Sequence, residues 1–182
     1  KYKIDDEEQF IKIVENNSVD QIIVFCVDES ISSKPDFYNG LIDEFINSKS
    51  TSLYGLINFG NEVKICQEFT SISSKFKYDE LNVTVKSDSK LLLYDAIQKA
   101  KEMIDQILHN YYDEEDFEYS YPNNYLRIIL ISSCSDKESK TAASDLVKGL
   151  IKQRTIVDTI FVSENDQNSE KQNEMFAVSK MT

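Results

Sequence analysis

Residues 21–32 are QIIVFCVDESIS, and this stretch decides the fold class. From Ile22 to Val27 the side chains form an unbroken apolar run of six, rich in β-branched residues and too short for a buried helix. Such a run is typical of a strand that is buried on both faces in the middle of a parallel sheet. The run stops at Asp28, so we expect polar side chains to follow directly at the carboxyl end of a central strand.

Strand-like and helix-like patterns alternate along the rest of the chain. Apolar runs predict core strands over 52–60, 126–133 and 155–162, and the Gly60-Asn61 turn predicts a hairpin to a half-exposed strand over 62–69. Apolar residues at helical spacing predict helices over 6–16, 35–46, 91–108, 141–152 and 170–180. A short helix near 76–81 and a brief strand over 83–85 complete the set. Because parallel strands need crossover helices, the order predicts a three-layered, Rossmann-like α/β fold. We expect a mostly parallel central sheet with one antiparallel edge hairpin and helices on both faces.

The length of 182 residues fits one domain with a short appendage. We expect a helical extension over 1–20, the α/β domain over 21–182, and an acidic, tyrosine-rich insertion over about 110–122. That insertion has two interpretations. It is either a solvated loop or a docking surface, because tyrosines supply contact area and acids attract basic partners. The residues that would contact a partner there are Tyr112, Asp113, Glu114, Glu115, Asp116 and Tyr119.

The charge balance excludes several classes of partner. The chain has 20 Lys and Arg against 32 Asp and Glu, a formal net charge of −12. Nucleic acid is not expected, because polyanions are bound by clusters of Lys and Arg, and an anionic membrane surface is disfavoured for the same reason. No apolar run approaches the roughly 20 residues of a membrane span. Three cysteines without a C-x-x-C pair favour core thiols and an intracellular, cytoplasmic location. The N-x-S/T sequons at Asn16 and Asn82 point to the alternative, an extracellular location.

No pattern for catalysis stands out. The one histidine, His109, falls at the end of a predicted helix, and neither a G-x-G-x-x-G nor a G-x-x-x-x-G-K-[ST] loop follows any strand. A nucleotide-binding or small-molecule enzyme is therefore the least favoured function, and we expect a non-enzymatic protein.

The pentapeptide after the first strand predicts a cation site. Asp28, Ser30 and Ser32 form D-x-S-x-S, and oxygen ligands leaving a strand end on a tight loop suit Mg²⁺ or Mn²⁺. The alternative is structural: the serines cap the next helix while Asp28 accepts backbone N–H bonds.

Four features in this order resemble the von Willebrand factor A (VWA) domain. They are the buried strand with DESIS, the hairpin YGLINFGNEVKICQEFT, the helix opening LYDAIQKAKEMI, and the strand LRIILISSCSD. The resemblance covers roughly residues 20–182. It implies a metal-ion-dependent adhesion site (MIDAS) at the top of the sheet, where a carboxylate of a partner completes the coordination of the metal. The family ends with a further strand and helix, so the resemblance also implies that the domain is truncated.

This sequence departs from the MIDAS pattern at two positions. The family has a threonine four residues before the L-Y-D aspartate, where this chain has Leu91, although a two-residue insertion would place Ser89 there. The later aspartate falls on Ser133, and Asp136 matches the second acid of the family but not its metal position. With one carboxylate instead of two, a site of Asp28, Ser30, Ser32, Ser89 and Ser133 should bind a cation weakly, in the millimolar range.

The function we expect is therefore that of a VWA-type protein-interaction module within a larger scaffold. It would bind a protein partner at the strand-end rim, with Glu29 among the contacts and with weak or absent cation dependence. The partner would present a carboxylate to the metal or a basic surface to the acidic loop. The alternative keeps the fold, treats the metal site as vestigial, and moves recognition to another surface such as the acidic insertion.

Overall fold

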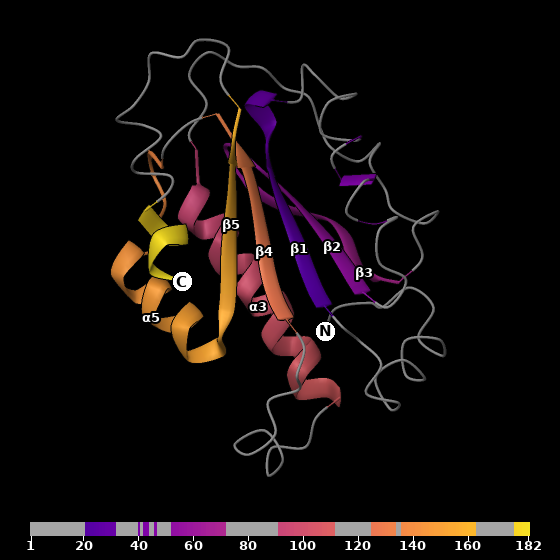
Figure 1. The fold of residues 1–182 in the computed structure, drawn as a ribbon. Helices are drawn as coiled ribbons and strands as arrows, with labels where there is room; N and C mark the ends of the chain where they lie inside the picture. The colour runs from indigo at the N-terminus through magenta and orange to yellow at the C-terminus, as the bar shows by residue number, and fades with distance from the viewer. Residues whose placement is uncertain are drawn as a thin grey trace.

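The computed structural model of the chain describes residues 21–31, 40, 42–43, 46, 52–71, 91–111, 125–133, 136–162 and 177–182. The described strands form a five-stranded sheet in the order β3-β2-β1-β4-β5 (Figure 1). The strands are β1 (Gln21–Asp28), β2 (Ser52–Phe59), β3 (Val63–Thr70), β4 (Tyr125–Ser132) and β5 (Thr155–Phe161). The helical elements whose bounds are described are a single 3₁₀ turn, η1 (Glu29–Ile31), then α3 (Leu93–Tyr111) and α5 (Ala143–Gln153).

The sheet is mostly parallel, as predicted. The central strand β1 pairs in parallel with β2 and β4, and β4 pairs in parallel with β5. β2 and β3 form the antiparallel edge hairpin. All eight residues of β1 are buried, which confirms that the apolar run from Ile22 to Val27 forms a central strand. The fold class is therefore α/β with the expected hairpin.

The hairpin strand β3 differs from its expected half-exposed pattern. The residues of its first half, Val63 to Ile65, are partly or fully exposed, but Gln67, Phe69 and Thr70 are buried. The pairing with β2 shifts register around Leu56, and such an irregularity breaks the alternation of faces along a strand. The alternating pattern therefore describes only the turn-proximal half of β3.

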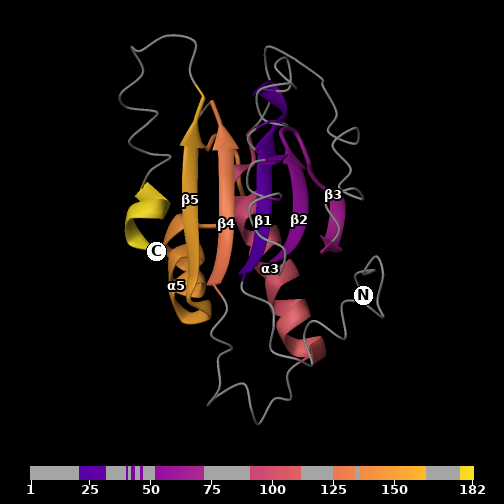
Figure 2. The same ribbon diagram turned by 45° about the vertical axis from the view of Figure 1, so that its right-hand side comes forward.

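Two apolar clusters lie on the two faces of the sheet. Ile22, Val24 and Cys26 of β1 pack with residues of α3 and α5, which cover one face (Figures 1 and 2). Their neighbours in β1 point to the other face, where they pack with Ile42 and Ile46 of a helical segment. Helices on both faces give the three layers that the sequence predicts. No helix in these described ranges is long and apolar enough to cross a membrane.

The other predicted elements have mixed outcomes. α3 begins two residues after the start of the predicted helix over 91–108 and continues through Tyr111, two residues into the predicted insertion. Residues 177–181 are helical, which overlaps the predicted final helix over 170–180 and extends one residue beyond it. The predicted helix over 6–16, the elements over 76–81 and 83–85, the extension over 1–20 and residues 112–122 lie outside the described residues. The division of the chain into these parts therefore stays a prediction.

Candidate functional site: the strand-end rim

The carboxyl ends of β1, β2, β4 and β5 lie at one edge of the sheet, because these four strands run in the same direction (Figure 2). We call this edge the rim. In open α/β sheets it is the edge at which ligands bind. Asp28, the last residue of β1, stands at the centre of the rim and its side chain is fully buried.

The Asp28 carboxylate bridges the ends of two neighbouring strands. Its Oδ2 atom accepts a hydrogen bond of 2.7 Å from the Ser132 hydroxyl and one of 3.2 Å from the Ser133 backbone N–H. The register pairs Val27 with Ile131, which sets Asp28 beside Ser132, the last residue of β4. Hydrogen bonds of this kind, to a charged group away from water, are among the stronger ones in proteins. Asp28 therefore ties β1 to β4 at the rim.

Of the five residues of the predicted cation site, the structure describes the side chains of Asp28 and Ser133. Ser133 lies at the rim beside Asp28, which it contacts through its backbone N–H. Ser30 belongs to the 3₁₀ turn η1, but its side chain lies outside the described set, as do Ser32 and Ser89. The convergence of the three D-x-S-x-S oxygens stays a prediction.

Glu29 lies beside the turn between β2 and β3. A Cβ atom added at Gly60 would clash with Glu29 Oε2, so the absence of a side chain at Gly60 makes room for this carboxylate. Burial raises the pKa of Glu29, and the nearby charges of Glu62 and Asp28 raise it further. Glu29, which the sequence assigned to partner contact, is thus an acid at the rim whose charged form is disfavoured. The other predicted contact residues, at 112–116 and 119, lie outside the described residues.

The described residues of the predicted cation site offer few charged ligands. Mg²⁺ binding is strengthened by several carboxylate oxygens, and Asp28 is the one carboxylate of the predicted set. Its Oδ2 atom accepts two hydrogen bonds from β4 and the residue after it. Within the described ranges, no three His, Cys, Asp or Glu side chains come close enough to hold a metal ion.

Asp136, which resembles the second acid of the family, caps α3 instead. Its Oδ1 atom accepts a hydrogen bond of 3.2 Å from the backbone N–H of Tyr94, in the first turn of α3. Its carboxylate also binds the backbone N–H and the hydroxyl of Ser139. The first N–H groups of a helix have no partner within the helix, so Asp136 supplies an acceptor to one of them from another part of the chain.

Asp95, in the first turn of α3, binds the loop that follows Ser139. Its Oδ1 atom accepts a hydrogen bond of 2.8 Å from the backbone N–H of Thr141, and its Oδ2 atom accepts one of 3.1 Å from the backbone N–H of Lys140. Partial burial alone would raise the pKa of Asp95. The Thr141 hydroxyl, the two backbone N–H groups and the Lys140 charge together outweigh that effect and hold the pKa below its ordinary value of 3.8. Asp95 is therefore an ionised group at neutral pH.

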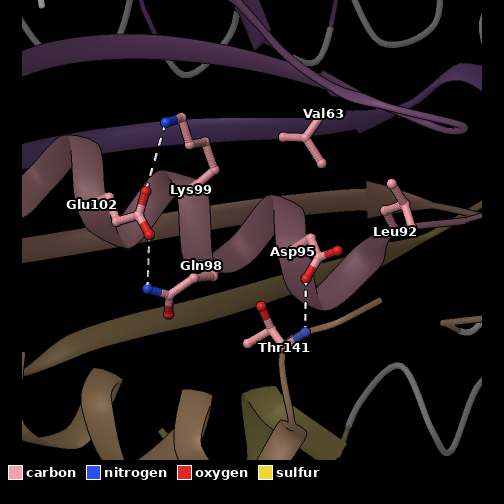
Figure 3. Close-up of a pocket in the computed structure, with 7 residues that line it drawn as sticks. All are labelled: Val63, Leu92, Asp95, Gln98, Lys99, Glu102 and Thr141. Atoms are coloured by element: carbon pink, nitrogen blue, oxygen red, sulfur yellow. Dashed lines mark hydrogen bonds and ion pairs between the residues drawn. The ribbon is translucent and has the colours of Figure 1, made fainter. Parts of the chain in front are cut away.

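A hollow of about 340 Å³ lies over the outer face of α3 beside this loop (Figure 3). It combines the carboxylate of Asp95 with polar side chains of α3 and two apolar side chains. Its lining residues are Val63, Leu92, Asp95, Gln98, Lys99, Glu102 and Thr141.

Sequence reasoning missed two of these functional groups. The sequence pattern places Ser132 within a strand, and it uses Asp95 only to identify the L-Y-D motif. A signal for Ser132 existed, because two adjacent parallel strands that both end in a polar residue bring these residues together. No local pattern points to the hydrogen bonds of Asp95, whose donors lie 45 and 46 residues further along the chain.

A scan of family models finds no match to the sequence, and no curated protein matches it. Solved structures do match its fold. The SpRpn10 VWA domain has a TM-score of 0.57 at 14% identity, over 88% of this chain and 82% of that one. An aerotolerance-related membrane protein from Bacteroides fragilis has a TM-score of 0.59 at 12% identity, over 88% and 87% of the two chains.

A third match is proximal thread matrix protein 1 from the mussel byssus, in a structure with a zinc-occupied MIDAS motif. Its TM-score is 0.54 at 15% identity, over 81% of this chain and 39% of that one. At such identities the likeness concerns the fold alone. The chain has a VWA-like fold, as its four motifs predicted.

Proposed function

We propose that this chain is a non-enzymatic protein-interaction module of the VWA type that binds a protein partner at the rim. One observation carries the proposal: the buried Asp28 carboxylate ties the ends of β1 and β4 together at the edge where four parallel strands end. A surface held in one conformation loses little entropy when a partner binds. Asp28 supports this surface from below, and Glu29, Ser30, Ser32, Ser89 and Ser133 would surround it.

The proposed binding depends weakly or not at all on a divalent cation. The described rim offers one buried carboxylate, and its Oδ2 atom already accepts two hydrogen bonds. Mg²⁺ or Mn²⁺ would bind in the millimolar range, which is typical of sites with few charged oxygens. The absence of a recognisable nucleophile–base pattern in the sequence supports a non-enzymatic role.

Two variants with the same change of charge test the rim. Glu29→Arg reverses an acid at the rim, and Asp43→Arg does the same at an exposed residue of the helical segment on the other face. Wild type and both variants are used as bait in lysate of the source cells, and the captured proteins are identified with and without EDTA. We expect a partner that wild type and Asp43→Arg retain, that Glu29→Arg loses, and that EDTA does not release.

If Glu29→Arg still captures every protein that wild type captures, the rim is excluded as the binding surface. If Tyr112→Ala and Tyr119→Ala then abolish capture, recognition belongs to the acidic insertion.

A separate pair of variants tests the cation. Ser133→Asp adds a second carboxylate beside Asp28, at the position where the family has its later aspartate. Ile151→Asp adds one at an exposed residue in the last turn of α5, away from the rim. In Mg²⁺ titrations followed by amide NMR, we expect Ser133→Asp to tighten binding at least about tenfold and Ile151→Asp to leave it unchanged. Tight wild-type binding centred on Asp28, in the micromolar range of sensor sites, would contradict the proposal.

The cellular setting we propose is a reducing, intracellular compartment. Cys26 and Cys66 are buried thiols, and burial raises the pKa of Cys26 strongly, so its unreactive thiol form is favoured. The domain would be one part of a larger scaffold, with the acidic insertion between α3 and β4.

A further inference from the structure

The hollow over α3 is built from one face of that helix. Asp95, Gln98, Lys99 and Glu102 are spaced three, one and three residues apart, so they share the face opposite to the buried stripe. Figure 3 shows Val63 across from this face and Thr141 on its other side. A volume of about 340 Å³ is at the lower end of the range for ligand sites, which suits a single side chain with its adjoining backbone.

Asp95 is the charged group at one end of the hollow. A carboxylate has about four lone-pair positions, and two backbone N–H groups and the Thr141 hydroxyl use three of them. The remaining position can accept one further donor. Because these bonds fix the carboxylate in place, an incoming donor would not have to order it.

The same end of the hollow also has an apolar wall. Val63 at the start of β3 and Leu92 just before α3 both line it, and both side chains are half-buried. A carboxylate beside apolar groups suits a side chain with an aliphatic stem and a cationic head.

The other charges near the hollow leave it with an excess of negative charge. Glu102 is paired with Lys99, 3.6 Å from Glu102 Oε2 to Lys99 Nζ, and it also accepts a hydrogen bond from Gln98. These pairs leave Asp95 as the unbalanced charge of the lining. Lys140, at the edge, partly offsets it. The whole chain carries a net charge of −12, which attracts basic partners over a longer range.

We propose that this hollow is a second binding site, distinct from the rim, that receives a lysine side chain of a protein partner. The stem of the lysine packs on Val63 and Leu92, and its ammonium group donates to Asp95. Lysine fits better than arginine, because a guanidinium group needs two parallel acceptors for its fork and Asp95 offers one. The proposal does not depend on binding at the rim.

The test uses the ¹⁵N-labelled chain and three blocked tripeptides, in which alanines flank a central lysine, arginine or glutamine. Each is titrated while the amide shifts of Val63, Leu92, Asp95 and Thr141 are followed. We expect saturable shifts with millimolar affinity for the lysine peptide, weaker binding of the arginine peptide, and none of the glutamine peptide.

Three variants make the test specific. Asp95→Asn keeps one of the two oxygens that accept from the loop but removes the charge, and it should weaken binding of the lysine peptide about tenfold. Lys140→Gln keeps its backbone N–H and removes the competing charge. It should tighten binding about two- to threefold, as Coulomb's law gives for a separation of roughly 7 Å in water. Val63→Thr replaces an apolar methyl group of the wall with a hydroxyl and keeps the shape of the side chain. It should weaken binding of the lysine peptide about two- to fivefold.

Equal binding of the lysine and glutamine peptides would overturn the proposal, as would unchanged binding by folded Asp95→Asn. If Asp95→Asn fails to fold, Lys140→Gln and Val63→Thr decide the matter, because their expected effects have opposite signs. Glu29→Arg should bind the peptide as wild type does, so a failure at the rim and a failure at the hollow can be told apart.

Discussion

Removal of the Ser132 hydroxyl should destabilise the domain more than most serine substitutions do. In Ser132→Ala, the buried Asp28 carboxylate loses the 2.7 Å hydrogen bond that joins β1 to β4. Both residues are fully buried, so water is not at hand to replace the lost donor. Hydrogen bonds to charged groups are worth about 1.5 to 3 kcal/mol net, and we expect a loss of that size in the free energy of unfolding.

Urea denaturation followed by circular dichroism measures this loss. With a slope of about 1 to 3 kcal/mol per molar urea, the transition midpoint should fall by about 1 M at an unchanged slope. Thr159→Val is the matched control, because the Thr159 Oγ1 atom is buried without a hydrogen-bond partner in the part of the chain described. Its removal should be neutral or stabilising.

A double-mutant cycle separates the hydrogen bond from other effects of the substitution. In an Asp28→Asn background the acceptor is neutral, so Ser132→Ala should cost about 1 kcal/mol less than in the wild-type chain. If the free energy of unfolding of Ser132→Ala lies within about 0.5 kcal/mol of the wild-type value, Asp28 does not tie the strands together. The physical basis for proposing a binding surface at the rim then fails.

Three further predictions concern other parts of the structure. Glu29→Gln should stabilise the domain at pH 7 by less than about 1 kcal/mol, because solvent screens this half-buried group, and the gain should vanish below its ordinary pKa of 4.5. The sign follows from the raised pKa: the protonated acid is favoured in the folded state, so stability is lost as the pH rises through the folded pKa. Equal gains at pH 4 and pH 7 in urea titrations would contradict this. Arg154 ends α5 in the left-handed conformation, at φ 58° and ψ 34°, so Arg154→Gly should raise the stability by about 0.5 to 1 kcal/mol, while Arg154→Ala should not. Thermal melts compare the two variants, and equal melting temperatures would refute the strain argument. Gln153→Ala removes a buried amide that donates hydrogen bonds of 3.1 Å to Lys101 O and 2.6 Å to Asp105 Oδ1. In urea denaturation, the free energy of unfolding should fall by about 2 to 4 kcal/mol. A loss under about 1 kcal/mol would show that the bridge between α3 and α5 contributes little.

The layers of the fold could be predicted because apolar periodicity reports directly which face of an element is buried. The continuous run from Ile22 to Val27 has one solution, a strand covered on both sides, and β1 is buried along its whole length. Polarity is a poorer guide to where an element ends. α3 continues through Tyr111, although the sequence turns polar at 110, because polar composition indicates exposure and not backbone conformation.

The site was harder to predict because its contacts connect residues that are distant in sequence. Ser132 and Asp28 are 104 residues apart, and the register of two strands, not a local motif, brings them together. Asp136 shows the same limit. Its place in the sequence resembles that of a functional acid, but its neighbours in space make it the cap of α3.

The D-x-S-x-S motif therefore admits two physical roles that no sequence pattern separates. A carboxylate at the end of a central strand can share a cation with nearby hydroxyls, or it can accept hydrogen bonds from the next strand. Which role prevails depends on what the neighbouring strand presents at that level. An acid there would repel Asp28 unless a cation lay between them, whereas the Ser132 hydroxyl and the Ser133 N–H are donors that bind it directly. In this chain, β4 and the residue after it supply donors, and these hydrogen bonds hold the end of β1 in place.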